Sequence, residues 1–372
     1  MKFTSILSAA LLAQSSFAHP GDSAEDTARE VAARREYLTN NKRSLAHCAE
    51  SLKARGNDVA MHKRRSAMVE QLRAKRSIAQ EKPYLKARTV EDSLNTNHKS
   101  NLTGITPDVD PSVIFAGNKS CILTPETTEG PYWIEGELVR QDITDGEVGI
   151  PMTLDLQLID VNTCEPLPEI YIDIWHCNST GVYSGVVAAS NGAGEADPDN
   201  LDNTALRGVQ PSDKDGVATF DTLMPGHYIG RATHIHVLTK TNATLNANST
   251  VSGGHISHVG QIYFDQDLIT LADTVEPYAS NEQPVTLNAD DYVLLGAGDA
   301  DPFVEYVMLG DDITDGIFAW LAFGMDANST QKPTPAVWLT EEGGVENPNA
   351  HDWLNDGGAA PRPSGAPPRP SA

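Results

Sequence analysis

Five short stretches in the middle of the chain alternate apolar and polar residues, the period of a β-strand with one buried face. They are MTLDLQLIDV (152–161), EIYIDIWHC (169–177), GVATFDTL (216–223), THIHVLTK (233–240) and GQIYFDQ (260–266). Clusters of Gly, Pro, Asn and Asp separate them, as turns do. Many short strands and little helix over about 200 residues predict a mainly β fold, an antiparallel or mixed β-sandwich.

The regions that flank these strands have a different pattern. Residues 22–80 include AEDTAREVAARREYL and AMVEQLRAKRSIAQ, which are rich in Ala, Glu, Arg and Leu and therefore predict helices. The last residues, NDGGAAPRPSGAPPRPSA, cannot build a core and predict a disordered tail. We therefore divide the chain after its first 18 residues into a helical N-terminal segment (19–90), a polar linker (91–118), a β-sandwich domain (119–345) and the disordered tail (355–372).

The start of the chain carries a secretion signal. In residues 1–18, Lys2 precedes an apolar run that ends in Ser-Phe-Ala, a small-residue cleavage pattern typical of a signal peptide rather than a membrane span. No later stretch approaches the ~20 consecutive apolar residues of a transmembrane helix. Six N-glycosylation sequons fit a secreted, extracellular glycoprotein. They lie at Asn101, Asn118, Asn178, Asn242, Asn248 and Asn328.

Charge changes sign along the chain. Residues 19–90 hold 16 Lys/Arg and 9 Asp/Glu, whereas residues 91–372 hold 10 and 42; with Lys2 these sum to the net charge of −24. The acidic body argues against nucleic acid or an anionic membrane as a partner. Three dibasic pairs (42–43, 64–65 and 75–76) have two interpretations, a solvated helix face or propeptide processing. Processing would leave an active domain without residues 19–76.

Four cysteines allow two disulfides in an oxidising compartment, with three connectivities. They are Cys48, Cys121, Cys164 and Cys177. Cys164 and Cys177 are expected at opposite ends of one strand, too far apart to join each other. We therefore expect each to pair with Cys48 or Cys121, and the alternative is a free Cys177.

The segment GHYIGRATHIHV (226–237) holds the candidate chemistry. In a strand, His234 and His236 face the same way and present two imidazoles to one metal. Such a pair alone is weak evidence, because a strand histidine is more often a surface or hydrogen-bonded residue. A cupin would place a glutamate where Thr239 and Lys240 stand, and a structural zinc site would need further cysteines or histidines nearby. The neighbouring tyrosines favour a hard ion such as Fe(III), because a phenolate is a hard anionic ligand.

Residues from about 121 to 265 resemble the intradiol ring-cleavage dioxygenases, most closely their secreted fungal branch. Four blocks carry the resemblance: LTPETTEGPYW (123–133), WHCNSTGVYS (175–184), LRGVQPSDKDGVATFDTLMPG (206–226) and the H-I-H pair. The resemblance implies a non-haem Fe(III) held by two tyrosines and two histidines. The matching residues are Tyr183, Tyr228, which follows Pro-Gly-His, His234 and His236.

The resemblance also implies roles around the metal. Arg231 matches an arginine over the substrate ring and Gln261 a glutamine near that ring, while Tyr228 would leave the metal and accept a substrate proton. A surface ion pair is the alternative for Arg231, and a polar residue of an edge strand for Gln261. Tyr132 either lines the pocket or is a packed aromatic. Tyr228 lies only six positions before His234, a shorter connection than in familiar members, which affects the expected pocket wall but not the ligation.

The implied activity is insertion of both atoms of O2 into a catechol-type aromatic diol, with intradiol cleavage to a muconate-type diacid. The alternative function is a non-catalytic secreted β-sandwich that binds carbohydrate or cell wall, and the complete Tyr/Tyr/His/His set speaks against it. The ring substituents of the substrate and the oligomeric state are not readable from these motifs.

Overall fold

The structure, a computed structural model, describes residues 45–79, 130–188, 190–192, 197–296 and 301–350. The predicted signal peptide, the linker, Cys121 and the predicted tail lie outside these residues. Within the described part of the chain, no helix has the length and apolar character that a membrane span requires.

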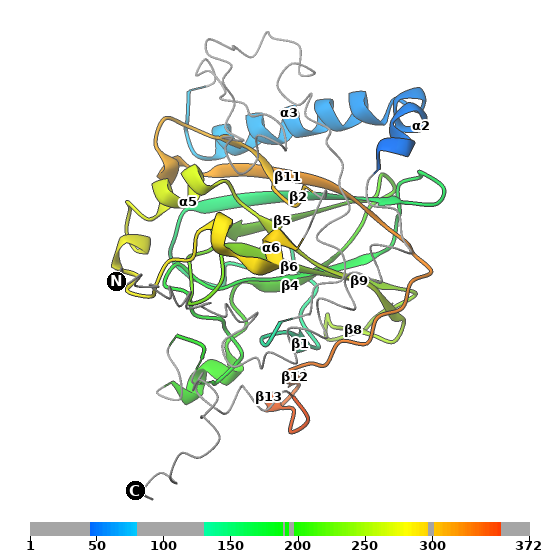
Figure 1. Cartoon of the computed structure of the whole chain (residues 1–372). Helices are drawn as coiled ribbons and strands as arrows, with labels where there is room; N and C mark the ends of the chain where they lie inside the picture. Colours follow the sequence, from blue (N-terminus) through cyan, green and yellow to red (C-terminus); the bar gives the residue numbers. More distant parts are fainter. Residues whose placement is uncertain (1–44, 80–129, 189, 193–196, 297–300, 351–372) are drawn as a thin grey trace, which may run out of the picture.

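Two four-stranded sheets form the body of the molecule (Figure 1). The first has the order β10-β11-β2-β5, and the second has the order β4-β3-β6-β9. All neighbours are antiparallel except β11 and β2, which run parallel. Their bounds are β2 (Pro151–Asp160), β3 (Tyr171–Trp175), β4 (Arg207–Pro211), β5 (Val217–Leu223), β6 (His234–Thr241), β9 (His255–Tyr263), β10 (Glu305–Met308) and β11 (Ile317–Met325).

The main core lies between the two sheets. Alternate side chains of β2, among them Leu154, Leu156 and Leu158, meet Ile174 of β3 and Ile235 of β6, and all five are fully buried. The sequence pattern placed these residues on inward faces because side chains alternate along a strand. The predicted mixed β-sandwich is confirmed.

Smaller elements complete the sandwich. A three-stranded sheet pairs a strand from the start of the domain with two strands from its end. A two-stranded hairpin and short helices lie in the connections between the strands of the two main sheets. Their bounds are β1 (Ile134–Glu135), β12 (Val337–Thr340) and β13 (Gly343–Glu346) for the sheet, β7 (Thr244–Leu245) and β8 (Val251–Ser252) for the hairpin, and α5 (Gln266–Ala272) and α6 (Tyr292–Leu295). Short 3-10 helices span Pro198–Asp202, Tyr278–Ser280, Asn288–Asp290 and Ile313–Asp315.

Of the two predicted N-terminal helical stretches, AEDTAREVAARREYL lies outside the described residues, whereas AMVEQLRAKRSIAQ overlaps α3 (Asn57–Lys75). A 3-10 turn (Ala46–Cys48) and α2 (Ala49–Ala54) precede α3. Helix α3 lies across the outer face of the first sheet (Figure 1), where Val69 packs against Phe318 and Trp320 of β11. The Arg65 guanidinium lies 5.5 Å from the centre of the Trp320 ring and 3.4 Å from a carboxylate oxygen of Asp155. Arg65 is therefore a buried contact and not part of a solvated helix face, whereas Arg64 is only partly buried.

A disulfide joins Cys48 to Cys164 and fastens the N-terminal segment to the loop after β2. This is one of the expected pairings, and β3 does lie between Cys164 and Cys177. Cys177 is free and buried, with its thiol 3.2 Å from the Gly226 carbonyl oxygen, to which it donates. The alternative of a free Cys177 therefore holds in this structure.

Candidate metal centre

The two histidines of the H-I-H pair lie on the same face of β6, as their spacing predicts. Their Nε2 atoms are 3.0 Å apart, and both side chains are buried. His234 Nδ1 lies 2.6 Å from the Ala232 carbonyl oxygen, which can only accept, so Nδ1 carries the proton of that ring. The lone pair of His234 therefore lies on Nε2, the atom that faces His236, as in histidines that ligate a metal.

The two candidate tyrosines reach the same place from different loops. Tyr183 lies in the loop after β3, and Tyr228 lies in the turn between β5 and β6. The Tyr228 hydroxyl is 3.4 Å from His234 Nε2. The rings of Tyr183 and Tyr228 meet edge to face with centroids 5.3 Å apart, and the Tyr183 ring is 6.0 Å from that of His236. The structure thus brings together all four residues that the sequence predicted as ligands.

Burial governs the ionisation of these phenols. It raises the pKa of both Tyr183 and Tyr228 well above the ordinary value, because a phenolate loses its hydration in the interior. The Tyr183 hydroxyl faces that of Tyr228 and has no other hydrogen-bond partner among the described residues. A buried phenolate pair needs a highly charged cation for compensation. Two phenol oxygens and two imidazole nitrogens in one dry place therefore fit Fe(III).

Arg231 is buried beside this cluster and held on three sides. Its Nε donates to the Asp291 carboxylate at 2.9 Å, and its Nη2 donates to the Gln261 side-chain oxygen at 2.6 Å and to the Tyr263 hydroxyl at 2.8 Å. The Arg231–Asp291 ion pair has no exposed surface, so a surface ion pair is the wrong alternative for Arg231. Gln261 is also fully buried, and its position opposite His236 in the sheet places it inside the site.

Two residues of this site were missed by the sequence reasoning. Asp291 precedes α6 and accepts the main-chain N–H groups of Ala232 and Leu294 in addition to Arg231. Burial alone would raise its pKa, but Arg231 and these N–H groups hold the pKa of Asp291 below the ordinary value. No local motif marks a carboxylate so distant in the chain. Tyr263, in contrast, lies two residues after Gln261 on β9, and strand alternation alone could have identified it.

Two aromatic side chains support the ligands. Trp175 stacks on the His236 imidazole with centroids 4.8 Å apart and planes 5° from parallel. The Tyr132 ring lies 4.7 Å from that of Tyr183, and its hydroxyl donates to Ser190 at 3.0 Å. Tyr132 is therefore a packed aromatic that contacts a candidate ligand.

Comparison with known proteins found a family model that matches part of this chain. Residues 125–290 match the model of the dioxygenase family, and the six predicted site residues all lie inside the matched segment. No curated protein gave a significant match.

Among solved structures, the chain is similar to an intradiol ring-cleavage dioxygenase from Tetranychus urticae, with 28% identity over 57% of this chain and 98% of the other, at a TM-score of 0.47. It is also similar to a catechol 1,2-dioxygenase from Acinetobacter sp. ADP1, with 20% identity over 57% of this chain and 68% of the other, at a TM-score of 0.37. A hydroxyquinol 1,2-dioxygenase from Pseudomonas putida DLL-E4 shows 17% identity over 59% and 70% of the two chains, at a TM-score of 0.36.

Proposed function

We propose that this chain, whose residues 125–290 match the dioxygenase family model, is a secreted non-haem Fe(III) enzyme that cleaves catechol-type rings between the two hydroxyl-bearing carbons. The family match and the site together support an intradiol ring-cleavage dioxygenase. The single observation that carries the proposal is the convergence of Tyr183, Tyr228, His234 and His236 in one buried place. The products would be muconate-type diacids.

The four converging residues would hold the iron, and when bound, the ferric ion would supply Lewis acidity and a template for the aromatic diol and O2. Two phenolates would reduce its net charge, which would allow it to rest among buried side chains. A bidentate diol needs room in the site, and Tyr228, as a phenolate, would give way, accept one of the diol protons at its oxygen and become a phenol. Trp175, stacked on His236, would keep that imidazole in place meanwhile.

Arg231 would bind the substrate and stabilise negative charge that develops on its ring. Asp291, Gln261 and Tyr263 fix its Nε and Nη2, so the guanidinium cannot turn away. Its Nη1 has no hydrogen-bond partner among the described residues and keeps its donors for an oxygen of the substrate. Because the guanidinium is already in position, it would stabilise the developing negative charge without any movement of the surrounding side chains during the reaction.

Metal analysis and visible spectroscopy of the purified chain test the proposal. We expect one iron per chain, a visible tyrosinate-to-Fe(III) charge-transfer band, and O2 consumption with one or more of a panel of catechols, with a diacid as product. A Tyr183→Phe/Tyr228→Phe double variant should lose the band, whereas Tyr171→Phe, on β3 away from the ligand set, should keep it. Full occupancy by zinc or copper in protein produced with iron supplied, or an iron-free chain that binds only carbohydrate, would refute the proposal.

A further inference from the structure

Two asparagine side chains, Asn191 and Asn200, hold the main chain of Tyr183. Its N–H donates to the Asn191 side-chain oxygen at 2.7 Å. Its carbonyl oxygen accepts from the side-chain amides of Asn191 at 2.7 Å and Asn200 at 2.9 Å. The same two amides also donate to the Val186 carbonyl, at 2.8 and 2.9 Å. The peptide groups on both sides of the Tyr183 Cα are thus fixed within a buried polar cluster.

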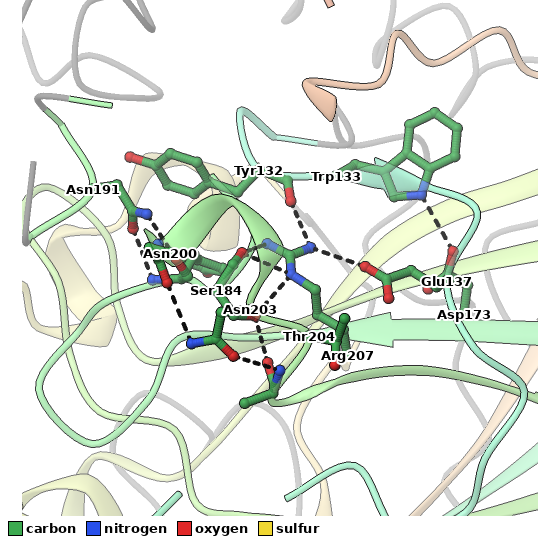
Figure 2. Close-up of polar contacts among 12 residues, drawn as sticks. Tyr132, Trp133, Glu137, Asp173, Ser184, Asn191, Asn200, Asn203, Thr204 and Arg207 are labelled. Atoms are coloured by element: carbon green, nitrogen blue, oxygen red, sulfur yellow. Dashed lines mark hydrogen bonds and ion pairs between the residues drawn. The ribbon is translucent and has the colours of Figure 1, made fainter. Parts of the chain in front are cut away.

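Arg207 holds the next residue. Its Nε and Nη2 donate to the Ser184 carbonyl oxygen at 2.9 and 2.6 Å, and its Nη1 donates to the Tyr132 carbonyl oxygen at 2.7 Å (Figure 2). Arg207 is buried, and a carboxyl oxygen of Glu137 lies 3.7 Å from its Nη1. A guanidinium suits this role because its planar fork can serve two carbonyls at once.

Arg207 also connects the Tyr183 loop to the histidine strand. In the second sheet, Arg207 of β4 is paired with Trp175 of β3, and Trp175 is paired with His236 of β6. One row across the sheet therefore contains the arginine that holds the loop, the tryptophan that stacks on the imidazole, and the imidazole itself. The positions of the Tyr183 loop and of His236 therefore both depend on this row of the second sheet.

The main chain of Tyr228 has much weaker support. Among the described residues, the Tyr228 main chain forms an isolated antiparallel bridge with Arg231, in which the Arg231 N–H makes a long hydrogen bond of 3.5 Å to the Tyr228 carbonyl oxygen. Side chains hold its neighbours instead: Asn281 donates to the His227 carbonyl at 2.8 Å, and the Ile229 N–H donates to the Gln283 side chain at 3.2 Å. The two tyrosines therefore differ in backbone support although they meet at one place.

We propose that Asn191, Asn200 and Arg207 are positioning residues that make Tyr183 the fixed tyrosine of the site and leave Tyr228 as the one that moves. The presence of iron at Tyr183 rests on the proposed function. The rigidity of the Tyr183 main chain does not, because hydrogen bonds within this chain produce it. Since buried hydrogen-bonding groups cost free energy when left unpaired, loss of one amide should loosen the whole Tyr183 loop.

Hydrogen exchange of the metal-free chain tests the rigidity directly. In the parent, we expect the Tyr183 amide to exchange at least tenfold more slowly than the Tyr228 amide. Asn191→Ala removes the acceptor of the Tyr183 N–H and should abolish that difference. The matched control is Asn203→Ala, because the Asn203 side chain contacts Asn200 and the Ala205 N–H but neither Tyr183 nor Ser184. If Asn191→Ala does not fold, Asn200→Ala, which removes one of two donors to the Tyr183 carbonyl, replaces it.

Iron release to a chelator, measured well below the melting temperature of each variant, tests the consequence. We expect Asn191→Ala and Arg207→Lys to release iron about tenfold faster than the parent and Asn203→Ala. Equal exchange at Tyr183 in parent and Asn191→Ala, or iron release that follows only the melting temperatures, would overturn the proposal. A parent without iron would refute the proposed function instead, and the exchange experiment would still decide on the positioning residues.

Discussion

Removal of the Cys48–Cys164 disulfide should have a large and measurable effect on stability. The perturbation is the double substitution Cys48→Ala/Cys164→Ala, chosen because both positions are buried and a serine hydroxyl would lack water there. The bridge joins residues 116 apart in sequence. In the chain-entropy model, a closed loop of that length stabilises the native state by about 5 kcal/mol, and native disulfides measured in other proteins commonly contribute ~2–4 kcal/mol. We expect a loss within about 2–5 kcal/mol.

The assay is equilibrium unfolding in urea, with and without a thiol reductant. The parent should lose stability on reduction, while the double variant should start near the reduced parent and be insensitive to the reductant. Cys177→Ala provides the control, because this thiol is free and its loss should leave the response to reductant intact. An unfolding midpoint of the double variant equal to that of the oxidised parent would refute the reasoning, since the bridge would then constrain nothing that matters in the unfolded chain.

Three further outcomes are expected. Tyr228→Phe should bind iron but lose most turnover, and Tyr183→Phe should weaken iron retention more; near-normal turnover of Tyr228→Phe would contradict this. The packing of α3 changes the expectation that the chain tolerates loss of residues 19–76. Their deletion should lower the melting temperature and promote aggregation, because apolar residues of β11 become exposed. A fully stable truncated chain would contradict this. Burial raises the pKa of Glu137 to about 8, so this group stabilises the fold when protonated, and that contribution is lost as pH rises through 8. In Glu137→Gln, the fall in melting temperature between pH 6 and 8 should become smaller, and an unchanged pH profile would contradict this.

The strands that the sequence predicted are those whose apolar and polar side chains alternate, although both faces of β2 and β6 are buried. The stretch 152–161 alternates and became β2, and the pair His234 and His236 lies on one face of β6 as alternation requires. The pattern missed β11, IFAWLAFGM, because its apolar residues run continuously. That run has a physical cause: one face of β11 packs into the sandwich and the other is covered by α3.

The candidate site also contains residues that the sequence predicted and residues that it did not. The four predicted metal ligands and Arg231 lie in short motifs whose spacing is meaningful within one strand or turn. Asp291 and the asparagines that hold Tyr183 are brought in by loops, where contacts depend on the whole fold and have no local period. The chemistry of the site was therefore predictable, whereas the side chains that keep it in position were not.

The burial of Arg65 has a consequence for proteolysis. A protease that cleaves after paired basic residues must bind both side chains along an extended backbone, but Arg64 and Arg65 lie within α3, and both form ion pairs with Asp155. The bond after Arg65 is thus open to cleavage only in molecules whose α3 has not docked on β11. Docking of α3 thus shields a basic pair that an undocked chain would offer to a protease. Brief trypsin digestion would separate the two populations, because only undocked chains would be cut after Arg65.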